Sequence, residues 1–435
     1  MRPSWRHIGA AALCLVGFAS LASLASAAEI AGSGEVRLEG EATSVNDAGP
    51  LAAANALVPG IVPIAGSGLR LEAELRGSWH PAATRPWLSS LDADVLLAAN
   101  RPQGGPTDNA SRINELHAAS DFGAWQLDAG KKIVSWGVGY GFRPNDVVQQ
   151  ERRRTLLPQT PEGRALLQVE HFGAEQAATL VWVNPQHAGE PADEQRGAEE
   201  SALDARWYTR QGAADWHVFG RWGEHTHASV GAALAFVATD ELELHASARA
   251  LQRHDGWQID PQAAAAVVAT NPWTQTTLGR TSQWLLGGSW TGQQQQSVLV
   301  EYWYDGSTLS DDQWDRWMVR NRGLSAFGAL PGLPAALVQA AAGNLAWQAT
   351  PFDTPNLRRD NLFVRLAWQP DHWLLSADAL LTPADRGHIV TLGVQWQGDR
   401  LRLNAVWRTY GGPANSLFAQ LPQRRIGVLA AAWVF

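Results

Sequence analysis

The sequence is poor in cysteine, in lysine and in long apolar runs. Its 435 residues contain one cysteine, Cys14, and the only lysines are Lys131 and Lys132. A lone cysteine excludes a disulfide within the chain and a cysteine-based metal site. The net charge of −8 disfavours nucleic acid as a partner. No apolar run reaches the roughly 20 residues that a membrane-spanning helix needs, so we expect no helical span.

Recognisable catalytic motifs are also missing. We find no Gly-x-Ser-x-Gly, no His-Glu-x-x-His and no phosphate-binding loop. His225 and His227, with Glu224 beside them, are the one pair that could bind a metal, but an exposed loop is the simpler interpretation. We therefore expect no metal and no cofactor, and no set of catalytic residues can be chosen from the sequence.

The first 27 residues have the three parts of a secretory signal peptide. A short basic start with Arg2 and Arg6 precedes an apolar stretch from Ala10 to Leu24, and Ala25-Ser26-Ala27 is a typical cleavage site. We expect residues 1–27 to be removed, which takes away Cys14 and makes the chain two charge units more negative. Residues 28–435 would then form one domain.

The remainder alternates between apolar and polar residues in segments of about ten. In the run from Arg70 to Arg76 every odd position is apolar and every even position is charged. This period of two predicts strands rather than helices, whose polar face would wind around the axis. The predicted strands cover 35–44, 68–79, 89–100, 112–120, 124–135, 164–172, 177–184, 201–210, 215–223, 228–238, 242–254, 282–291, 297–305, 360–369, 373–382, 387–396, 401–410 and 425–435.

Short and long connections mostly alternate between these segments, as they do in outer-membrane barrels with short periplasmic turns and longer outer loops. Many of the 22 tryptophans lie near segment ends, where aromatic girdles are found. The sequence thus predicts an all-β fold: a single antiparallel up-and-down transmembrane β-barrel of about 18 strands, with 16 as the alternative. Short helices are expected in the outer loops, near 310–320 and 333–345.

The last strand carries a feature of its own. Counting back in steps of two from Phe435 gives Trp433, Ala431, Leu429 and Gly427, a continuous apolar face. A final strand that pairs with the first leaves no free edge in a membrane. The ending resembles the C-terminal insertion signal of Gram-negative outer-membrane proteins, with Trp433 and Phe435 as its aromatic residues, which implies recognition by the barrel-assembly machinery.

Alternation also predicts which charged side chains point into the lumen. One wall is expected to be mixed or acidic and the opposite wall basic, so that a field crosses the pore. The alternative is that these charges merely pair and support the wall. The predicted lumen residues are Arg70, Glu72, Glu74, Arg76, Arg206, Arg210, Arg221, Arg249, Arg365, Arg402 and Arg408, with Glu35, Arg37, Asp92, Asp94, His217 and His245 among further candidates.

The long segment from Trp136 to Arg164 is a candidate constriction. Its glycines at 137, 139 and 141 allow a sharp inward turn, and its arginines could select anionic groups. The alternative is a solvated outer loop facing lipopolysaccharide. The predicted constriction residues are Arg143, Asp146, Glu151, Arg152, Arg153 and Arg154.

The same region carries a family resemblance. Gly130-Lys131-Lys132-Ile133-Val134-Ser135-Trp136-Gly137, followed by Arg143-Pro144-Asn145-Asp146-Val147, is similar to a strand and loop of alginate-export and related porin-like proteins of 16 to 18 strands. Lys131-Lys132 replaces the Arg-Gln of that pattern. The resemblance implies a barrel architecture and a transport role, without naming a solute.

Together these features predict a porin-like channel in the outer membrane of a Gram-negative bacterium. It would pass a small hydrophilic solute, with anions as candidates, down its gradient, and its lipid partners would include lipopolysaccharide. Two alternatives stay open: an outer-membrane hydrolase with its site at the outer loops, and a structural or assembly barrel that serves another protein.

Overall fold

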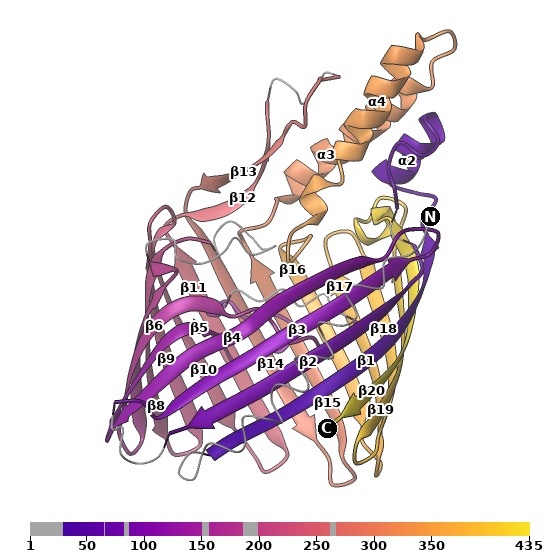
Figure 1. Cartoon of the computed structure of the whole chain (residues 1–435). Coiled ribbons are helices and arrows are strands. Elements are labelled where there is room, and N and C mark those ends of the chain that lie inside the picture. The colour runs from indigo at the N-terminus through magenta and orange to yellow at the C-terminus, as the bar shows by residue number, and fades with distance from the viewer. Residues whose placement is uncertain (1–28, 65, 82–86, 150–155, 186–198, 262–266) are drawn as a thin grey trace.

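The protein is a closed β-barrel whose wall is one antiparallel sheet of 18 strands (Figure 1). The computed structural model describes residues 29–64, 66–81, 87–149, 156–185, 199–261 and 267–435. The predicted signal peptide and its cleavage site lie outside the described residues. The prediction of about 18 strands is confirmed, and each predicted segment overlaps one wall strand.

The wall strands follow the chain around the cylinder. They are β1 (Glu29–Val45), β2 (Gly68–His80), β3 (Ser90–Pro102), β4 (Asp108–Phe122), β5 (Trp125–Lys132), β6 (Arg164–Phe172), β7 (Gln176–Val183), β8 (Ala202–Gln211), β9 (Ala214–Gly223), β10 (His227–Val237), β11 (Leu242–Leu251), β14 (Thr281–Thr291), β15 (Gln296–Asp305), β16 (Asp360–Trp368), β17 (Trp373–Thr382), β18 (Gly387–Gln397), β19 (Leu401–Gly411) and β20 (Gln423–Val434).

Closure depends on the last strand, which pairs with β19 on one side and with β1 on the other. The backbone N–H of Gly34 donates to the carbonyl of Phe435 at 2.8 Å, and the N–H of Phe435 donates back to Gly34 at 2.9 Å. A closed cylinder satisfies the backbone groups that an edge strand would expose to lipid.

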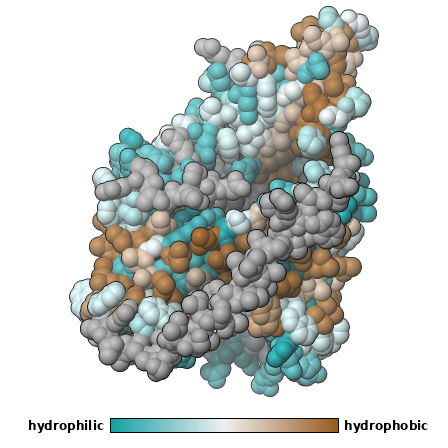
Figure 2. All heavy atoms as spheres, viewed as in Figure 1, coloured by the Kyte–Doolittle hydropathy of each residue, from teal (hydrophilic) through white to brown (hydrophobic). Residues whose placement is uncertain are grey.

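The side chains alternate across this wall. On β2, Leu69 and Leu71 point outward and are 55% and 48% exposed, whereas the next residue, Glu72, points inward and is 5% exposed. On β20, Leu429 is exposed on the outside and Val428 is buried inside. Figure 2 shows hydrophobic residues across the middle of the wall and hydrophilic residues toward its two ends. This is the pattern of a barrel with an apolar outer surface.

The two ends of the barrel differ. Both ends of the wall, the start of β1 and the end of β20, lie at the end with short turns (Figure 1). The opposite end carries the helices α2 (Pro50–Leu57), α3 (Asp311–Gly328) and α4 (Ala335–Trp347), the 3₁₀ turns η4 (Thr350–Phe352) and η5 (Phe418–Gln420), and a hairpin of β12 (His254–Ile259) and β13 (Trp273–Leu278). None of the helices in the described part of the chain is long and apolar enough to cross a bilayer.

The helices near 310–320 and 333–345 were expected; α2 and the β12–β13 hairpin were not. Ser310 and Gln313 form a capping box that starts α3. Trp314 and Trp317 of α3 are buried with Phe352 and Phe418, so this insertion forms a packed cap beside the mouth. Farther out, α2 packs on α3 and α4 through Ala54, Leu324 and Leu345.

Candidate functional site

The segment between β5 and β6, which we call the crossing loop, lies inside the barrel in its described parts, residues 133–149 and 156–163. Trp136, Val147 and Val148 of this loop are buried against Val181 and Phe219, which point inward from β7 and β9. Farther along, Leu157 packs on Ile426 and Val428 of β20. The two described parts of this loop therefore contact different walls of the lumen.

Glycine allows the first turn of the crossing loop. Gly137 has a φ of 136°, a value that other residues rarely adopt. Gly141 approaches the wall so closely that a Cβ atom there would lie 2.9 Å from the Trp303 ring and 3.1 Å from Glu301. The expectation that these glycines turn the backbone inward agrees with this path.

A buried carboxylate on β15 holds this first part of the loop. Glu301 accepts hydrogen bonds from the backbone N–H groups of Tyr140 and Gly141, both at 2.6 Å. His245 of β11 donates from Nε2 to the same carboxylate at 2.9 Å. Glu301 is 0% exposed, and charge-assisted hydrogen bonds of this kind are stronger than neutral ones. Glu301 was not among the predicted lumen residues, although it alternates inward with Trp303 and Asp305 on β15.

Two predicted lumen arginines hold the next part of the loop. Arg221 of β9 donates to the carbonyl of Val147 at 2.9 Å and pairs with Asp204 at 2.8 Å and Glu200 at 3.3 Å. Arg249 of β11 donates to the carbonyl of Pro144 at 3.3 Å. Both arginines face the lumen, but they bind the protein's own loop rather than open solvent.

The end of the crossing loop is held by arginines from the N-terminal strands. Arg37 donates to the carbonyl of Pro158 at 3.0 Å, Arg76 to the hydroxyl of Thr160 at 3.0 Å and Arg112 to the carbonyl of Thr160 at 2.8 Å. The loop is thus fixed at both ends by charged groups of the wall.

The predicted charges on β1 to β3 pair with one another. Arg70 lies 2.6 Å from Glu72, and Arg76 lies 2.9 Å from Glu74 and 3.1 Å from Asp94. Arg402 belongs to β19, beside β20 and two strands from β1, and donates to Glu35 at 3.3 Å. Acidic and basic residues therefore share this side of the lumen, as a mixed wall would, but Arg402, which was assigned to the opposite, basic wall, lies on the same side.

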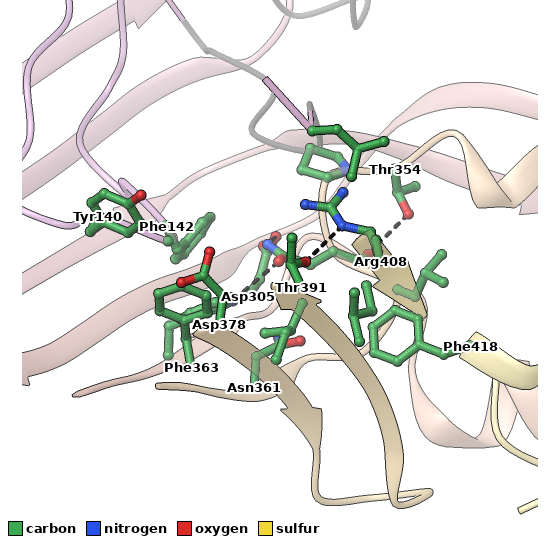
Figure 3. A pocket seen from close by; sticks show the side chains of 18 of the residues that line it. Tyr140, Phe142, Asp305, Thr354, Asn361, Phe363, Asp378, Thr391, Arg408 and Phe418 are labelled. Atoms are coloured by element: carbon green, nitrogen blue, oxygen red, sulfur yellow. Dashed lines mark hydrogen bonds between the residues drawn. The ribbon is translucent and has the colours of Figure 1, made fainter. Parts of the chain in front are cut away.

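On the other side of the loop a cavity of about 910 Å³ remains open. Its wall is formed mainly by β15 to β19, which we call the open wall. Tyr140 and Phe142 of the crossing loop border it on one side, where they stack on Phe363 and Trp303 at centroid distances of 5.8 and 5.9 Å. In Figure 3, Arg408, Thr391 and Phe418 lie across from Tyr140 and Phe142.

Two of the predicted arginines face this cavity from the open wall. Arg365 pairs with Asp378 at 3.0 Å and lies 5.3 Å from the centre of the Tyr140 ring. Arg408 donates to the hydroxyl of Thr391 at 2.9 Å. The cation beside an aromatic ring and the second guanidinium give this part of the cavity both cationic and apolar contacts, while five aspartates also line the cavity. The aromatic residues of this surface were not selected from the sequence, because their partners come from strands far apart in the chain.

The cavity extends over most of the height of the wall. Trp257 and Phe418 line it at the end with long loops, and Leu374 and Gln395 line it within three residues of the short turns.

The remaining predicted residues lie elsewhere. Arg143 and Asp146 belong to the crossing loop and line the cavity. Arg206 faces the lumen and lies 5.6 Å from the ring centre of Tyr208, while Arg210 is exposed at the end with short turns. Glu151, Arg152, Arg153 and Arg154 lie outside the described residues, so their place in the constriction stays a prediction.

The possible metal pair does not form a metal site in the described residues. His225 lies 2.8 Å from Asp255 and 3.3 Å from Glu200, and His227 lies 3.2 Å from Arg253. No group of three metal-binding side chains occurs in the described ranges. Burial alone would raise the pKa of Glu200, but hydrogen bonds from Thr226 and His225 and the charge of Arg221 hold that pKa below its usual value. Glu200 therefore stays ionised and fixes the outer end of β9.

Comparison with known proteins identifies the fold but no family. No protein-family model matches the sequence, and no curated protein matches it. Among solved structures, OccK5 (OpdH) of Pseudomonas aeruginosa aligns over 94% of this chain and 98% of its own, with 12% identity and a TM-score of 0.51. Variants of the Rh. blastica porin align over 94% of this chain and 100% of their own at 9–10% identity, but we draw nothing from their TM-scores of 0.41. The chain thus has the fold of a porin-like outer-membrane barrel.

Proposed function

We propose that this barrel is an outer-membrane channel through which small hydrophilic solutes diffuse down their gradient. The observation that carries the proposal is the cavity left open by the crossing loop, which is lined from the outer loops almost to the short turns. Wide barrels conduct unless their interior is filled, and here the filling is one-sided.

We propose further that the channel prefers anions. Arg365 and Arg408 project from the open wall toward this cavity. Several of the carboxylates that also line it are engaged: Asp146 accepts the N–H of Trp136 at 3.0 Å, and Asp305 accepts from Gln283 at 2.9 Å. Guanidinium groups attract and orient anionic groups, and engaged carboxylates repel them less. A role for Arg152, Arg153 and Arg154 would add to the same preference.

The test is an ion current across planar bilayers that contain the full mature chain. In a salt gradient the reversal potential should show a preference for chloride over potassium. Changing Arg365→Gln together with Arg408→Gln should lower that preference. Arg253→Gln is the matched control, because Arg253 is exposed on the loop after β11 and does not line the cavity.

The outcomes separate the two parts of the proposal. A barrel that carries no current contradicts passive diffusion altogether. A current whose selectivity is unchanged in the double variant leaves the channel in place and removes the role of these arginines. The triple change of Arg152, Arg153 and Arg154 to glutamine then tests the other candidate for anion selection.

The same proposal assigns the protein to the outer membrane of a Gram-negative bacterium, with lipopolysaccharide as its outer lipid. We propose that Trp433 and Phe435 serve as the signal read by the barrel-assembly machinery. Both side chains are 49% exposed on the last strand. Replacing both with alanine should reduce the amount of heat-modifiable barrel in outer-membrane fractions, and an unchanged amount would contradict this role.

A further inference from the structure

A second cavity, of about 410 Å³, lies at the outer rim of the barrel rather than in its lumen. It is bounded by β12, by the start of β14, by the end of β15 and by the start of α3. Ser282 and Tyr304 line it from outward-facing positions, since their strand neighbours Gln283 and Asp305 line the lumen cavity. The second cavity thus adjoins the lumen cavity at Trp257, Ser307 and Thr308 and reaches the outside of the wall at Ser282 and Tyr304.

Aromatic residues mark the height of this cavity in the membrane. Trp284 stacks on Tyr304 at a centroid distance of 6.0 Å and packs on Tyr302 at 5.4 Å. All three are outward positions near the long-loop ends of their strands. Tyrosine and tryptophan gather at membrane interfaces, where one end of the ring is apolar and the other wet. An aromatic belt at this height would put the cavity at the level of the lipid headgroups.

Two arginines give this cavity a positive charge. Arg280 and Arg359 line it, and neither makes an ion pair with any described residue. Arg359 donates from Nε to the carbonyl of Thr308 at 3.3 Å, which fixes the direction of its guanidinium group. The neighbouring Arg358 behaves differently, because it pairs with Asp311 at 2.9 Å and Asp385 at 3.0 Å.

The other side chains of this cavity add donors but no negative charge. Its described lining residues include Thr281, Ser282 and Tyr304 and contain no carboxylate. His254 donates from Nδ1 to the carbonyl of Gly279 at 2.9 Å, and its burial lowers its pKa, so it is neutral at pH 7. In a chain with a net charge of −8, this outward-facing cavity with two arginines and several hydroxyl groups is suited to an anion.

We infer that the rim cavity binds a phosphate monoester carried on the headgroup of an outer-leaflet lipid. A guanidinium group can donate two parallel hydrogen bonds to the oxygens of one phosphate, and a small spherical anion cannot accept them in the same way. The position at the aromatic belt favours a lipid as the carrier of this phosphate. The site lies outside the lumen cavity, so the inference does not depend on what the channel passes.

The test uses the full mature chain, freed of lipid in detergent and titrated with lipid A that carries both phosphates. Retained lipid is counted by native mass spectrometry. The same lipid without its phosphates is the second titrant. The phosphorylated lipid should bind about tenfold more tightly, as expected for loss of charge-assisted hydrogen bonds at a solvated site. The double change Arg280→Gln with Arg359→Gln should remove that difference.

Arg316→Gln with Arg322→Gln is the matched control, because both of these arginines are exposed on α3 and neither lines the cavity. Heat-modifiable migration in gels establishes that each variant is folded, and the two-lipid comparison on the unaltered protein needs no variant. Glucose 1-phosphate, a soluble phosphate ester, tests whether the lipid part of the ligand matters. If it competes with lipid A for the protein, the site recognises the phosphate on any carrier. If it does not compete, the site requires the lipid. Equal affinity for the two forms of lipid A would overturn the inference.

Discussion

The two sides of the lumen have the same strand alternation but different interiors. Along β1 to β10, which we call the filled wall, most of the inward charges described above bind one another or the crossing loop. Arg221 there has a side chain that is 3% exposed, against 23% for Arg365 on the open wall. The difference shows that alternation decides which residues face inward, while the neighbouring strands decide whether an inward charge is used for structure or remains accessible to solutes.

The largest expected effect comes from removing the loop that separates the two sides. Replacing residues 138–160 with a short Gly-Ser linker should raise the single-channel conductance severalfold, because the loop and the partners it holds occupy much of the lumen. The measurement is the current step in planar bilayers. An unchanged step would mean that the crossing loop does not limit flow.

The next largest effect is a difference in the stability lost when an arginine is removed from the filled wall or from the open wall. Arg221→Met leaves Asp204 and Glu200 buried without their cation, and breaking a buried ion pair in this way costs about 3–5 kcal/mol. Arg365→Met removes a less buried pair with Asp378, whose side chains are 23% and 21% exposed, and we expect a smaller loss, toward the about 0–1 kcal/mol of solvent-exposed pairs. Urea-induced unfolding in detergent micelles measures both losses. Equal losses would show that the filled wall is not the structural side.

A smaller effect is expected at the loop's carboxylate anchor. Glu301→Gln keeps the size of the side chain but removes the negative charge that accepts from Tyr140, Gly141 and His245. Hydrogen bonds to charged groups contribute about 1.5–3 kcal/mol each, and a neutral amide retains part of that stabilisation. We expect frequent short fluctuations of the current instead of the full opening caused by loop replacement. Steady currents would contradict the anchoring role. Glu175→Gln, at an exposed carboxylate in the turn between β6 and β7, is the control.

The smallest effect is a loosening of the outer cap at low pH. Burial alone would raise the pKa of Asp385, but hydrogen bonds from Thr382 and from the N–H groups of Leu417 and Gly387, with the charge of Arg358, hold that pKa below its ordinary value of 3.8. A lowered pKa stabilises the folded cap above about pH 4, and this stabilisation is lost as the pH falls toward the folded-state value. Current noise should therefore increase below about pH 4, and less so in Asp385→Asn, whose cap is already weakened. Identical acid responses would contradict this.

The sequence was sufficient to predict the strands of the wall, but not what the inward side chains of those strands bind. The alternation from Arg70 to Arg76 defines which face is outward, and the apolar exterior of each strand leaves one register that buries the charges. Hence the 18 strands and the inward charges could be predicted. The helix α2 was missed because Pro50–Leu57 has no side-chain cap at its start, and the β12–β13 hairpin because its strands are only six residues long.

The path of the crossing loop could be predicted only in part. Its glycines indicate a sharp turn, but Glu301 lies about 160 positions further along the chain than the N–H groups that it binds. Arg221 and Arg249 are inward by alternation, yet their role depends on where the loop lies. The side on which Arg402 lies could not be predicted for the same reason, since β19 comes within two strands of β1 only when the barrel closes through β20.

The central claim, a path confined to the open wall, can be tested directly by thiol labelling. The only cysteine is Cys14 in the predicted signal peptide, so single cysteines can be introduced into a background without thiols. Ser376→Cys lies on the open wall in the cavity, and Ser247→Cys lies on β11 beneath Asn145 of the crossing loop, where Ser247 is 4% exposed. A charged, water-soluble thiosulfonate should react at position 376 and reduce the current, and should leave position 247 and its current unchanged. Equal block at both positions, or block at position 247 alone, would contradict the account.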